Sequence, residues 1–260
     1  MSGEILHVAV LEATGITVRF GGFIAVSDAS LVAKPGQVTS LIGPNGAGKT
    51  TMFHAISGIL TPESGETKLD GRSLKGMTPD KRARAGMART FQILELFSGL
   101  SVAENLQVAV EGRSADSAWR DLFSLRHPDN PAVLRKVREA MELVGIADLA
   151  DRPAGSLPTG LSRLVELGRA LCTDPKVLLL DEPASGLSNA ETDRLHEVLR
   201  SLADLGMTIL LVEHDIELVM ALSAQIYVLD FGAMIAQGTP KEVRSNPAVR
   251  AAYLGAEVEA

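Results

Sequence analysis

The chain has 260 residues, of which 46% are hydrophobic, 22% charged and 4% aromatic. These values are typical of a folded globular protein and exclude a disordered, collagen-like or coiled-coil chain. The net charge of −7 disfavours a general nucleic-acid-binding protein, since such proteins carry a basic field. The single cysteine, Cys172, cannot form an internal disulfide, and no apolar run approaches the ~18 residues that cross a bilayer. We therefore expect a cytosolic protein with neither a membrane span nor an export signal.

Hydrophobic periodicity predicts strands and helices that alternate over most of the chain. From 101 to 150 the strand pattern disappears, and helical signatures begin with a capping box formed by Ser101 and Glu104. The strands of the second half are apolar throughout, which is typical of strands buried on both faces of a parallel sheet. The predicted strands are 15–20, 29–32, 38–42, 66–69, 177–180, 208–212 and 226–229, and the predicted helices are 49–56, one beginning at 78, 161–172, 189–205 and 216–223.

A glycine-rich segment follows the strand predicted at 38–42. It matches the pattern G-x-x-x-x-G-K-[ST] between a strand and a helix. Its glycines let backbone N–H groups surround a phosphate, Lys49 adds a full positive charge, and the Thr50 hydroxyl is placed to bind Mg²⁺. A plain glycine turn has no need of Lys-Thr at this spacing. The candidate phosphate-binding residues are Gly43, Pro44, Asn45, Gly46, Ala47, Gly48, Lys49, Thr50 and Thr51.

Two other strand ends carry polar side chains suited to the same site. Asp181 and Glu182 follow the strand predicted at 177–180, at the edge where α/β sheets bind ligands. We expect Asp181 to hold Mg²⁺, directly or through water, and Glu182 to orient or deprotonate an attacking water; the alternative is a solvated acidic turn. His214 is a candidate donor to a γ-phosphate, although such a histidine, taken alone, more often has only local partners.

These residues, with three further segments, resemble the nucleotide-binding subunit of an ABC transporter along essentially the whole chain. Gln92, in Ala88-Arg89-Thr90-Phe91-Gln92, is similar to the family's Q-loop. Leu157-Pro158-Thr159-Gly160-Leu161 takes the place of the LSGGQ signature, and Phe20 resembles the aromatic residue that stacks on adenine, with a core strand phenylalanine as the alternative. The resemblance implies ATP and Mg²⁺ as cofactors, catalytic roles for Lys49, Gln92, Glu182 and His214, nucleotide contacts from Phe20, Thr159 and Gly160, and metal binding by Thr50, Gln92 and Asp181.

The expected fold is α/β. It consists of a P-loop NTPase core with a mainly parallel sheet, an N-terminal antiparallel β-subdomain and an inserted α-helical subdomain. We expect residues 1–96 and 159–260 to form the ATP-binding core with the C-terminal tail, and residues 97–158 to form the inserted subdomain.

The resemblance also implies partners and a location. Two such subunits pair head to tail, so that each ATP lies between one chain's P-loop and the other's signature helix. The insert and the Gln92 loop form the groove that receives a coupling helix of an integral-membrane permease. A solute-binding protein is an indirect partner, nucleic acid is not expected, and the chain is expected to act peripherally at the cytoplasmic face of the inner membrane.

Within the family, the chain is most similar to the ATP-binding subunits of importers for branched-chain and other hydrophobic amino acids. The supporting segments are residues 85–92, the long insert and the tail at 236–255. Part of the tail pattern is ordinary helix chemistry, because Thr239 and Glu242 form a capping box with Pro240 at the first helical position.

Three positions depart from the family pattern. Pro158 replaces the signature serine, Leu161 replaces its glutamine, and Ser188 stands where the D-loop commonly has aspartate. Ser188 also forms a capping box with Glu191. Since the signature acts on the partner's nucleotide, these changes favour an asymmetric heterodimer, with a homodimer as the alternative.

Other functions remain open at the level of sequence. A soluble P-loop small-molecule kinase needs a second substrate pocket and has no reason for Gln92 or the glycine at 160. The remaining alternatives are an ABC ATPase of an export system and an ABC protein that regulates without fast turnover.

Overall fold

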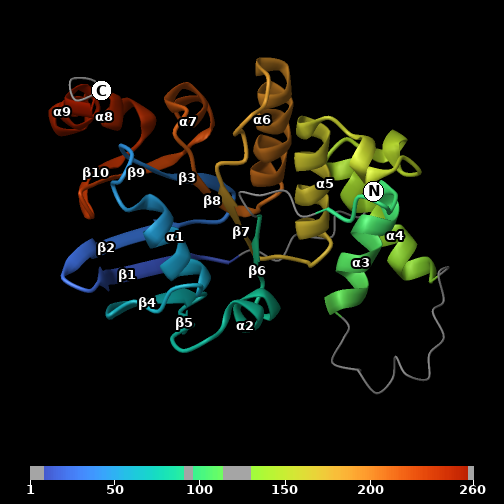
Figure 1. Cartoon of the computed structure of the whole chain (residues 1–260), viewed down its shortest axis with the longest axis horizontal. Helices are drawn as coiled ribbons and strands as arrows, with labels where there is room; N and C mark the ends of the chain where they lie inside the picture. Colours follow the sequence, from blue (N-terminus) through green and yellow to red (C-terminus); the bar gives the residue numbers. More distant parts are fainter. Residues whose placement is uncertain (1–8, 91–95, 114–129, 257–260) are drawn as a thin grey trace. The chain divides into compact units, whose positions relative to one another are not determined.

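The computed structural model describes residues 9–90, 96–113 and 130–256, and the chain divides into two compact units. The first unit takes its described residues from Met1–Arg89, Lys176–Pro183 and Leu199–Ala260. The second takes them from Thr90–Pro175 and Ala184–Val198. Figure 1 labels the helices and strands of both units.

The first unit contains a six-stranded sheet in the order β10-β9-β3-β8-β7-β6. All neighbours are parallel except β10 and β9, which pair antiparallel. Every residue of β7 and β8 is buried, as the unbroken apolar runs predict for strands covered on both faces. The strands are β3 Gln37–Ile42, β6 Met87–Arg89, β7 Val177–Asp181, β8 Thr208–Val212, β9 Gln225–Asp230 and β10 Ala233–Gly238.

A four-stranded antiparallel sheet, in the order β2-β1-β4-β5, belongs to the same unit. Buried residues alternate with less buried ones along β1, which is the pattern of a sheet with one face on the core. The register of β1 shifts between Ala13 and Ile16, where Gly15 has φ 62°. The strands are β1 Leu11–Phe20, β2 Phe23–Ala33, β4 Ser64–Leu69 and β5 Arg72–Ser73.

Helix α1 (Lys49–Ser57) joins the two sheets in one hydrophobic core. Met52, Phe53 and Ile56 of this helix are fully buried among residues of both sheets.

At the C-terminal end of the chain, the predicted capping box of α8 is confirmed, since Glu242 N–H donates to the Thr239 hydroxyl and Thr239 N–H to the Glu242 carboxylate. The remaining helices of this unit are α2 Pro79–Arg84, α7 Ile216–Leu222, α8 Pro240–Ser245 and α9 Pro247–Ala256.

In the second unit, α3 (Val102–Arg113), α4 (Pro131–Leu143) and α5 (Thr159–Leu171) pack against one another (Figure 1). Short 3₁₀ turns at Ala147–Leu149 and Ala154–Ser156 precede α5. The predicted capping box is confirmed: Ser101 N–H donates to Glu104 at 2.7 Å, and Glu104 N–H donates to Ser101 Oγ at 3.2 Å. The last large helix, α6 (Asn189–Asp204), contributes residues to both units.

The predicted α/β class is confirmed, and most predicted elements agree with the structure within a few residues. The strands β5, β6 and β10 were not predicted, because two or three residues give no periodic signal and β10 is only half-buried.

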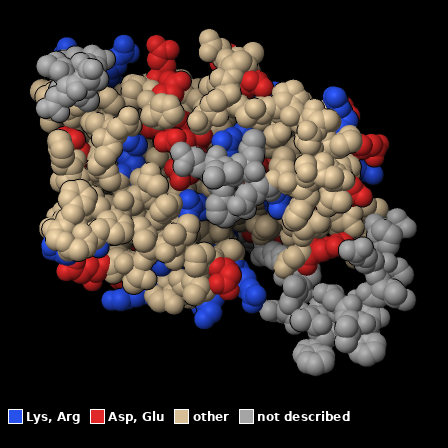
Figure 2. All heavy atoms as spheres, viewed as in Figure 1, with Lys and Arg blue, Asp and Glu red and all other residues tan. Residues whose placement is uncertain are grey.

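Among the described helices, none has the length and apolarity to cross a membrane. Acidic and basic side chains are interspersed on the face shown in Figure 2.

Candidate nucleotide site

The glycine-rich loop connects β3 to α1 in a backbone conformation that glycine alone adopts easily. Gly43 has φ 155° and Gly48 has φ 101°. A Cβ atom on Gly43 would lie 2.0 Å from Leu229 O, and one on Gly48 would lie 2.4 Å from Ala25 O. These two glycines therefore let the loop pass directly against neighbouring backbone.

Lys49 begins α1 and is 7% exposed. Its ammonium donates to Gly43 O at 2.7 Å and to Pro44 O at 2.9 Å. Burial lowers the pKa of Lys49, and the Glu182 carboxylate opposes this shift. The lysine is thus a buried cation beside a loop of backbone N–H groups, which is the chemistry that a phosphate requires.

The carboxylates predicted at the end of β7 have different environments. Asp181 is 3% exposed, and its Oδ2 lies 3.4 Å from Arg89 Nη2. Burial raises the pKa of Asp181, Arg89 opposes the shift and Glu182 adds to it. Glu182 lies just beyond the strand with φ 47°, a left-handed conformation that is uncommon for a residue with a side chain, and its N–H donates to Val212 O at 2.9 Å.

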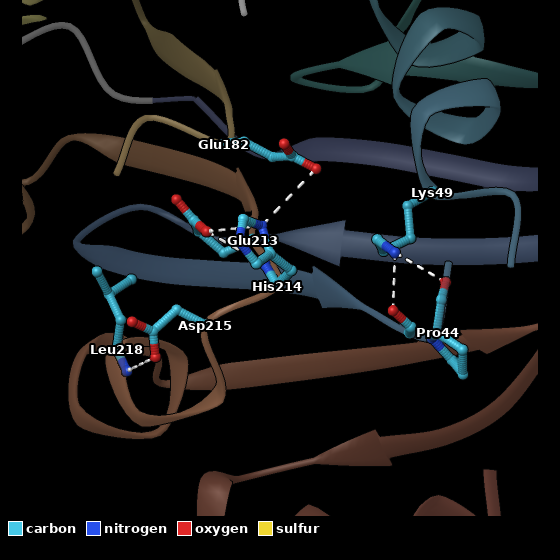
Figure 3. A network of polar contacts seen from close by, with 8 residues as sticks. Pro44, Lys49, Glu182, Glu213, His214, Asp215 and Leu218 are labelled. Carbon is cyan, nitrogen blue, oxygen red and sulfur yellow. Dashed lines mark hydrogen bonds and ion pairs between the residues drawn. The ribbon is translucent and has the colours of Figure 1, made fainter. Parts of the chain in front are cut away.

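His214 lies beyond the end of β8 and points to the same group of side chains (Figure 3). Its Nδ1 lies 3.9 Å from Glu182 Oε1 and 3.7 Å from Glu213 Oε2. More than half of the His214 side chain is exposed, at 57%. The structure therefore gives this histidine acidic neighbours and also access to a ligand from solvent.

Glu213 is a site residue that the sequence interpretation missed. It is 0% exposed, and its carboxylate accepts the backbone N–H of His214 at 3.1 Å. Asp215 caps α7 by accepting the backbone N–H of Leu218 at 3.1 Å (Figure 3). A buried carboxylate directly after an apolar strand needs polar partners. That requirement was a usable signal, because Glu213 immediately follows the buried strand β8.

Phe20 ends β1 and is 50% exposed. It is paired with Phe23, which starts β2 and is 66% exposed. The interpretation of Phe20 as a core strand residue is wrong, and its ring is free to contact a ligand. Of the residues after Lys49, Thr50 is exposed and Thr51 half-buried.

The second unit contains the glycine-bearing start of α5. Pro158 makes no side-chain cap, and the carboxylate of Glu191 instead accepts the Gly160 N–H at 3.1 Å. The same carboxylate accepts the Ser188 N–H at 2.9 Å and the Ser188 hydroxyl at 2.8 Å. Glu191 therefore serves the N-termini of both α5 and α6, and Thr159 next to Gly160 is exposed. Pro158, Gly160, Leu161, Glu191 and Arg194 are among the residues that line a cavity of about 350 Å³ here.

Comparison with known proteins matches the chain to the ABC transporter family over residues 26–185 and to the branched-chain amino acid ATP-binding cassette transporter family over residues 233–259. The chain is 42% identical to the high-affinity branched-chain amino acid transport ATP-binding protein BraF of Pseudomonas aeruginosa, over 95% of this chain and 98% of the relative. The corresponding protein LivG of Escherichia coli is 40% identical, with the same coverage. A solved ATP-binding cassette of an ABC transporter in its ADP conformation has TM-score 0.84 and 30% identity, over 95% of this chain and 99% of that one.

The chain belongs to the ABC transporter family. It is the ATP-binding subunit of a transporter, and the family is one of ATPases. Membership implies permease partners in the membrane and does not favour the small-molecule kinase. The recognition of the family from its motifs is confirmed.

Gln92, the residue of the predicted Q-loop, lies outside the described part of the chain, in residues 91–95. The metal-binding hypothesis for Asp181 and Thr50 concerns one carboxylate and one hydroxyl, and the described residues contain no cluster of three or more His, Cys, Asp or Glu side chains suited to a metal. The Asp181 carboxylate and the Thr50 hydroxyl are hard oxygen ligands of the kind that Mg²⁺ prefers. In such sites water and phosphate oxygens usually supply the remaining ligands.

Gly46 and Gly48, two of the three glycines in the loop between β3 and α1, give a first testable prediction. A Cβ on Gly46 meets no atom within 4 Å, so Gly46→Ala is expected to cost only the strain of φ 79°, about 1 kcal/mol. Gly48→Ala adds a backbone collision and is expected to lower the free energy of unfolding by about 3 kcal/mol. Urea unfolding of both variants measures the difference, and equal losses would contradict the contact with Ala25.

Glu191 gives a prediction on pH. The Ser188 N–H, the Ser188 hydroxyl and the Gly160 N–H lower the pKa of Glu191 from its ordinary value of 4.5. Its contribution to stability is therefore complete above pH 4.5 and is lost as the pH falls through the lowered value. The difference in Tm between the wild type and Glu191→Gln is expected to be largest near neutral pH and to shrink in acid.

The matched control for this experiment is Glu197→Gln, which changes an exposed carboxylate of the same helix. It is expected to shift Tm little. A Tm difference for Glu191→Gln that grows toward low pH would contradict the capping contacts.

Proposed function

We propose that this chain is the ATP-hydrolysing subunit of an importer for branched-chain or other hydrophobic amino acids. The names of the relatives at 40–42% identity and the match of residues 233–259 support this substrate class. Import, rather than export or regulation, is part of this proposal, and the names of the same relatives, which specify high-affinity amino acid transport, support transport over regulation. The solute itself is recognised by other subunits of the transporter.

One observation carries the ATP-binding part of the proposal. The buried ammonium of Lys49, the acidic end of β7 and His214 meet at one edge of the parallel sheet (Figure 3). In this proposal Gly43–Thr51 bind the phosphates, Lys49 exchanges its two carbonyl partners for phosphate oxygens, and Phe20 stacks on adenine. Glu182 accepts a proton from the attacking water and His214 donates to the γ-phosphate.

Mg²⁺ is proposed to be held by Thr50, Asp181 and Gln92. When bound, the ion neutralises charge that develops on the phosphate oxygens. The buried, ionisable Asp181 and the exposed hydroxyl of Thr50 suit this donor set.

We propose that a second ATP-binding subunit pairs with this chain. Each nucleotide site then combines the P-loop of one chain with the signature of the other, and the partner's P-loop faces Thr159 and Gly160 of this chain. Pro158 offers no hydroxyl at this place, and the Gly160 N–H is engaged by Glu191. The site built with this chain's signature is therefore the weaker one, while Lys49, Asp181, Glu182 and His214 are complete. This asymmetry favours a heterodimer.

The remaining partners are proposed from family membership. Residues 97–158 form the inserted subdomain, which receives a coupling helix of the permease together with the loop of Gln92. A solute-binding protein delivers the amino acid to the permeases. The chain acts peripherally at the cytoplasmic face of the inner membrane.

Two variants test the nucleotide site separately. Lys49→Ala removes a buried charge from the phosphates and is expected to weaken binding of a fluorescent ATP analogue about tenfold or more. Glu182→Gln keeps the shape of the side chain, so binding is retained while hydrolysis falls roughly 100-fold or more. Binding is measured by fluorescence titration and hydrolysis by phosphate release. Retained binding in Lys49→Ala would count against the phosphate site.

The heterodimer is tested by reconstitution with its co-purifying partner ATPase. Glu182→Gln in this chain is expected to remove most ATPase activity, because this chain's P-loop pairs with the partner's stronger signature. The equivalent change in the partner is expected to remove little. Equal loss of phosphate release from the two mixed complexes would rule out the asymmetry.

A further inference from the structure

Arg89, the last residue of β6, is half-buried between three elements of the first unit. Its side chain is 13% exposed. Nη2 lies 3.4 Å from Asp181 Oδ2 at the end of β7, and Nη1 donates to Ser57 Oγ at 3.2 Å in α1. The guanidinium also lies over the ring of Phe53, 4.9 Å from its centroid. One side chain thus links β6, β7 and α1.

The elements that Arg89 joins are those that carry the proposed metal ligands. Helix α1 begins with Lys49 and Thr50, and β7 ends with Asp181. The register pairs Arg89 with Leu179, two residues before Asp181. The distance between the helix and the strand end is therefore set partly by the guanidinium that lies between them.

We propose that Arg89 is a positioning residue that holds the Asp181 carboxylate and α1 in the arrangement that binds Mg²⁺ with the nucleotide. This inference depends on the assignment of Asp181 and Thr50 to the metal in the proposed function. A carboxylate has two oxygens with several acceptor sites, and the contact with Arg89 is made to Oδ2. Groups that orient a metal ligand in this way typically change metal affinity by about 10-fold to 100-fold when they are removed.

The chemistry of this position requires arginine. A guanidinium is planar and has separate donors, so it contacts Ser57 and Asp181 with different nitrogens while it stacks on Phe53. Lysine carries its charge at one point and cannot keep all three contacts. Arg89→Lys therefore separates the geometry of the contact from its charge.

Arg82 provides a matched control. It is 5% exposed and, like Arg89, binds α1, donating to the carbonyl oxygens of Ala55 and Ile56 and also to Met77 O. Its contacts are with carbonyl groups, whereas Arg89 contacts a carboxylate. Loss of Arg82 disturbs the same helix without acting on Asp181.

The experiment measures the affinity of the full chain for a fluorescent ATP analogue with Mg²⁺ and with EDTA. For Arg89→Met and Arg89→Lys, we expect affinity with Mg²⁺ to fall about tenfold and affinity in EDTA to stay unchanged. For Arg82→Met, we expect a lower Tm and an unchanged ratio of the two affinities. Ser57→Ala, which removes one anchor of the guanidinium, is expected to lower the ratio in the same direction and to a smaller extent, and it serves where the Arg89 variants do not fold.

Two outcomes would overturn the inference while the proposed function stands. One is an unchanged ratio of the two affinities, which includes equal losses with and without Mg²⁺, and the other is a higher Mg²⁺ affinity, which would mean that Arg89 competes with the ion. A wild-type chain whose affinity for the analogue does not respond to Mg²⁺ would overturn the metal assignment of the proposed function itself, and the inference with it.

Discussion

Parallel pairing of β3, β8 and β7 brings the chemistry of this protein together. Since neighbouring parallel strands end at the same edge of a sheet, the residues that follow them meet there although they are far apart in the sequence. Lys49 follows β3 through the phosphate loop, Asp181 and Glu182 follow β7, and Glu213 follows β8. The close fit of Gly43 and Gly48 against Leu229 and Ala25 then fixes the loop on this edge.

Burial of charge is the main cost of this arrangement, and the buried groups offset one another. Lys49, Asp181 and Glu213 are each less than a tenth exposed. Backbone carbonyl groups accept from Lys49, Arg89 pairs with Asp181, and the His214 N–H donates to Glu213. A buried charge without such a partner destabilises a fold by several kcal/mol, which explains why these contacts come from the backbone and from neighbouring strands.

Sequence patterns predicted the parts of the site that depend on short segments and missed those that depend on the fold. The glycine-rich loop and the acidic end of β7 could be singled out in the sequence because their spacing is local. Arg89 was not singled out, since its partners are 32 and 92 residues away. The contact between Glu191 and Gly160 spans 31 residues, and only the capping half of it, to Ser188, is visible in the sequence. The exposure of Phe20, which decides between a ring in the core and a ring open to ligand, likewise required the structure.

The position of β3 has a consequence for synthesis of the chain. Its neighbours in the sheet are β8 and β9, which begin at Thr208 and Gln225. Until those residues leave the ribosome, an apolar strand of the first fifth of the protein has neither of its hydrogen-bonding neighbours. The glycine-rich loop after β3 therefore reaches its final structure late in synthesis. A fragment that ends before β8 is not a partly active ATPase, and it exposes an unpaired strand edge that can pair with other chains.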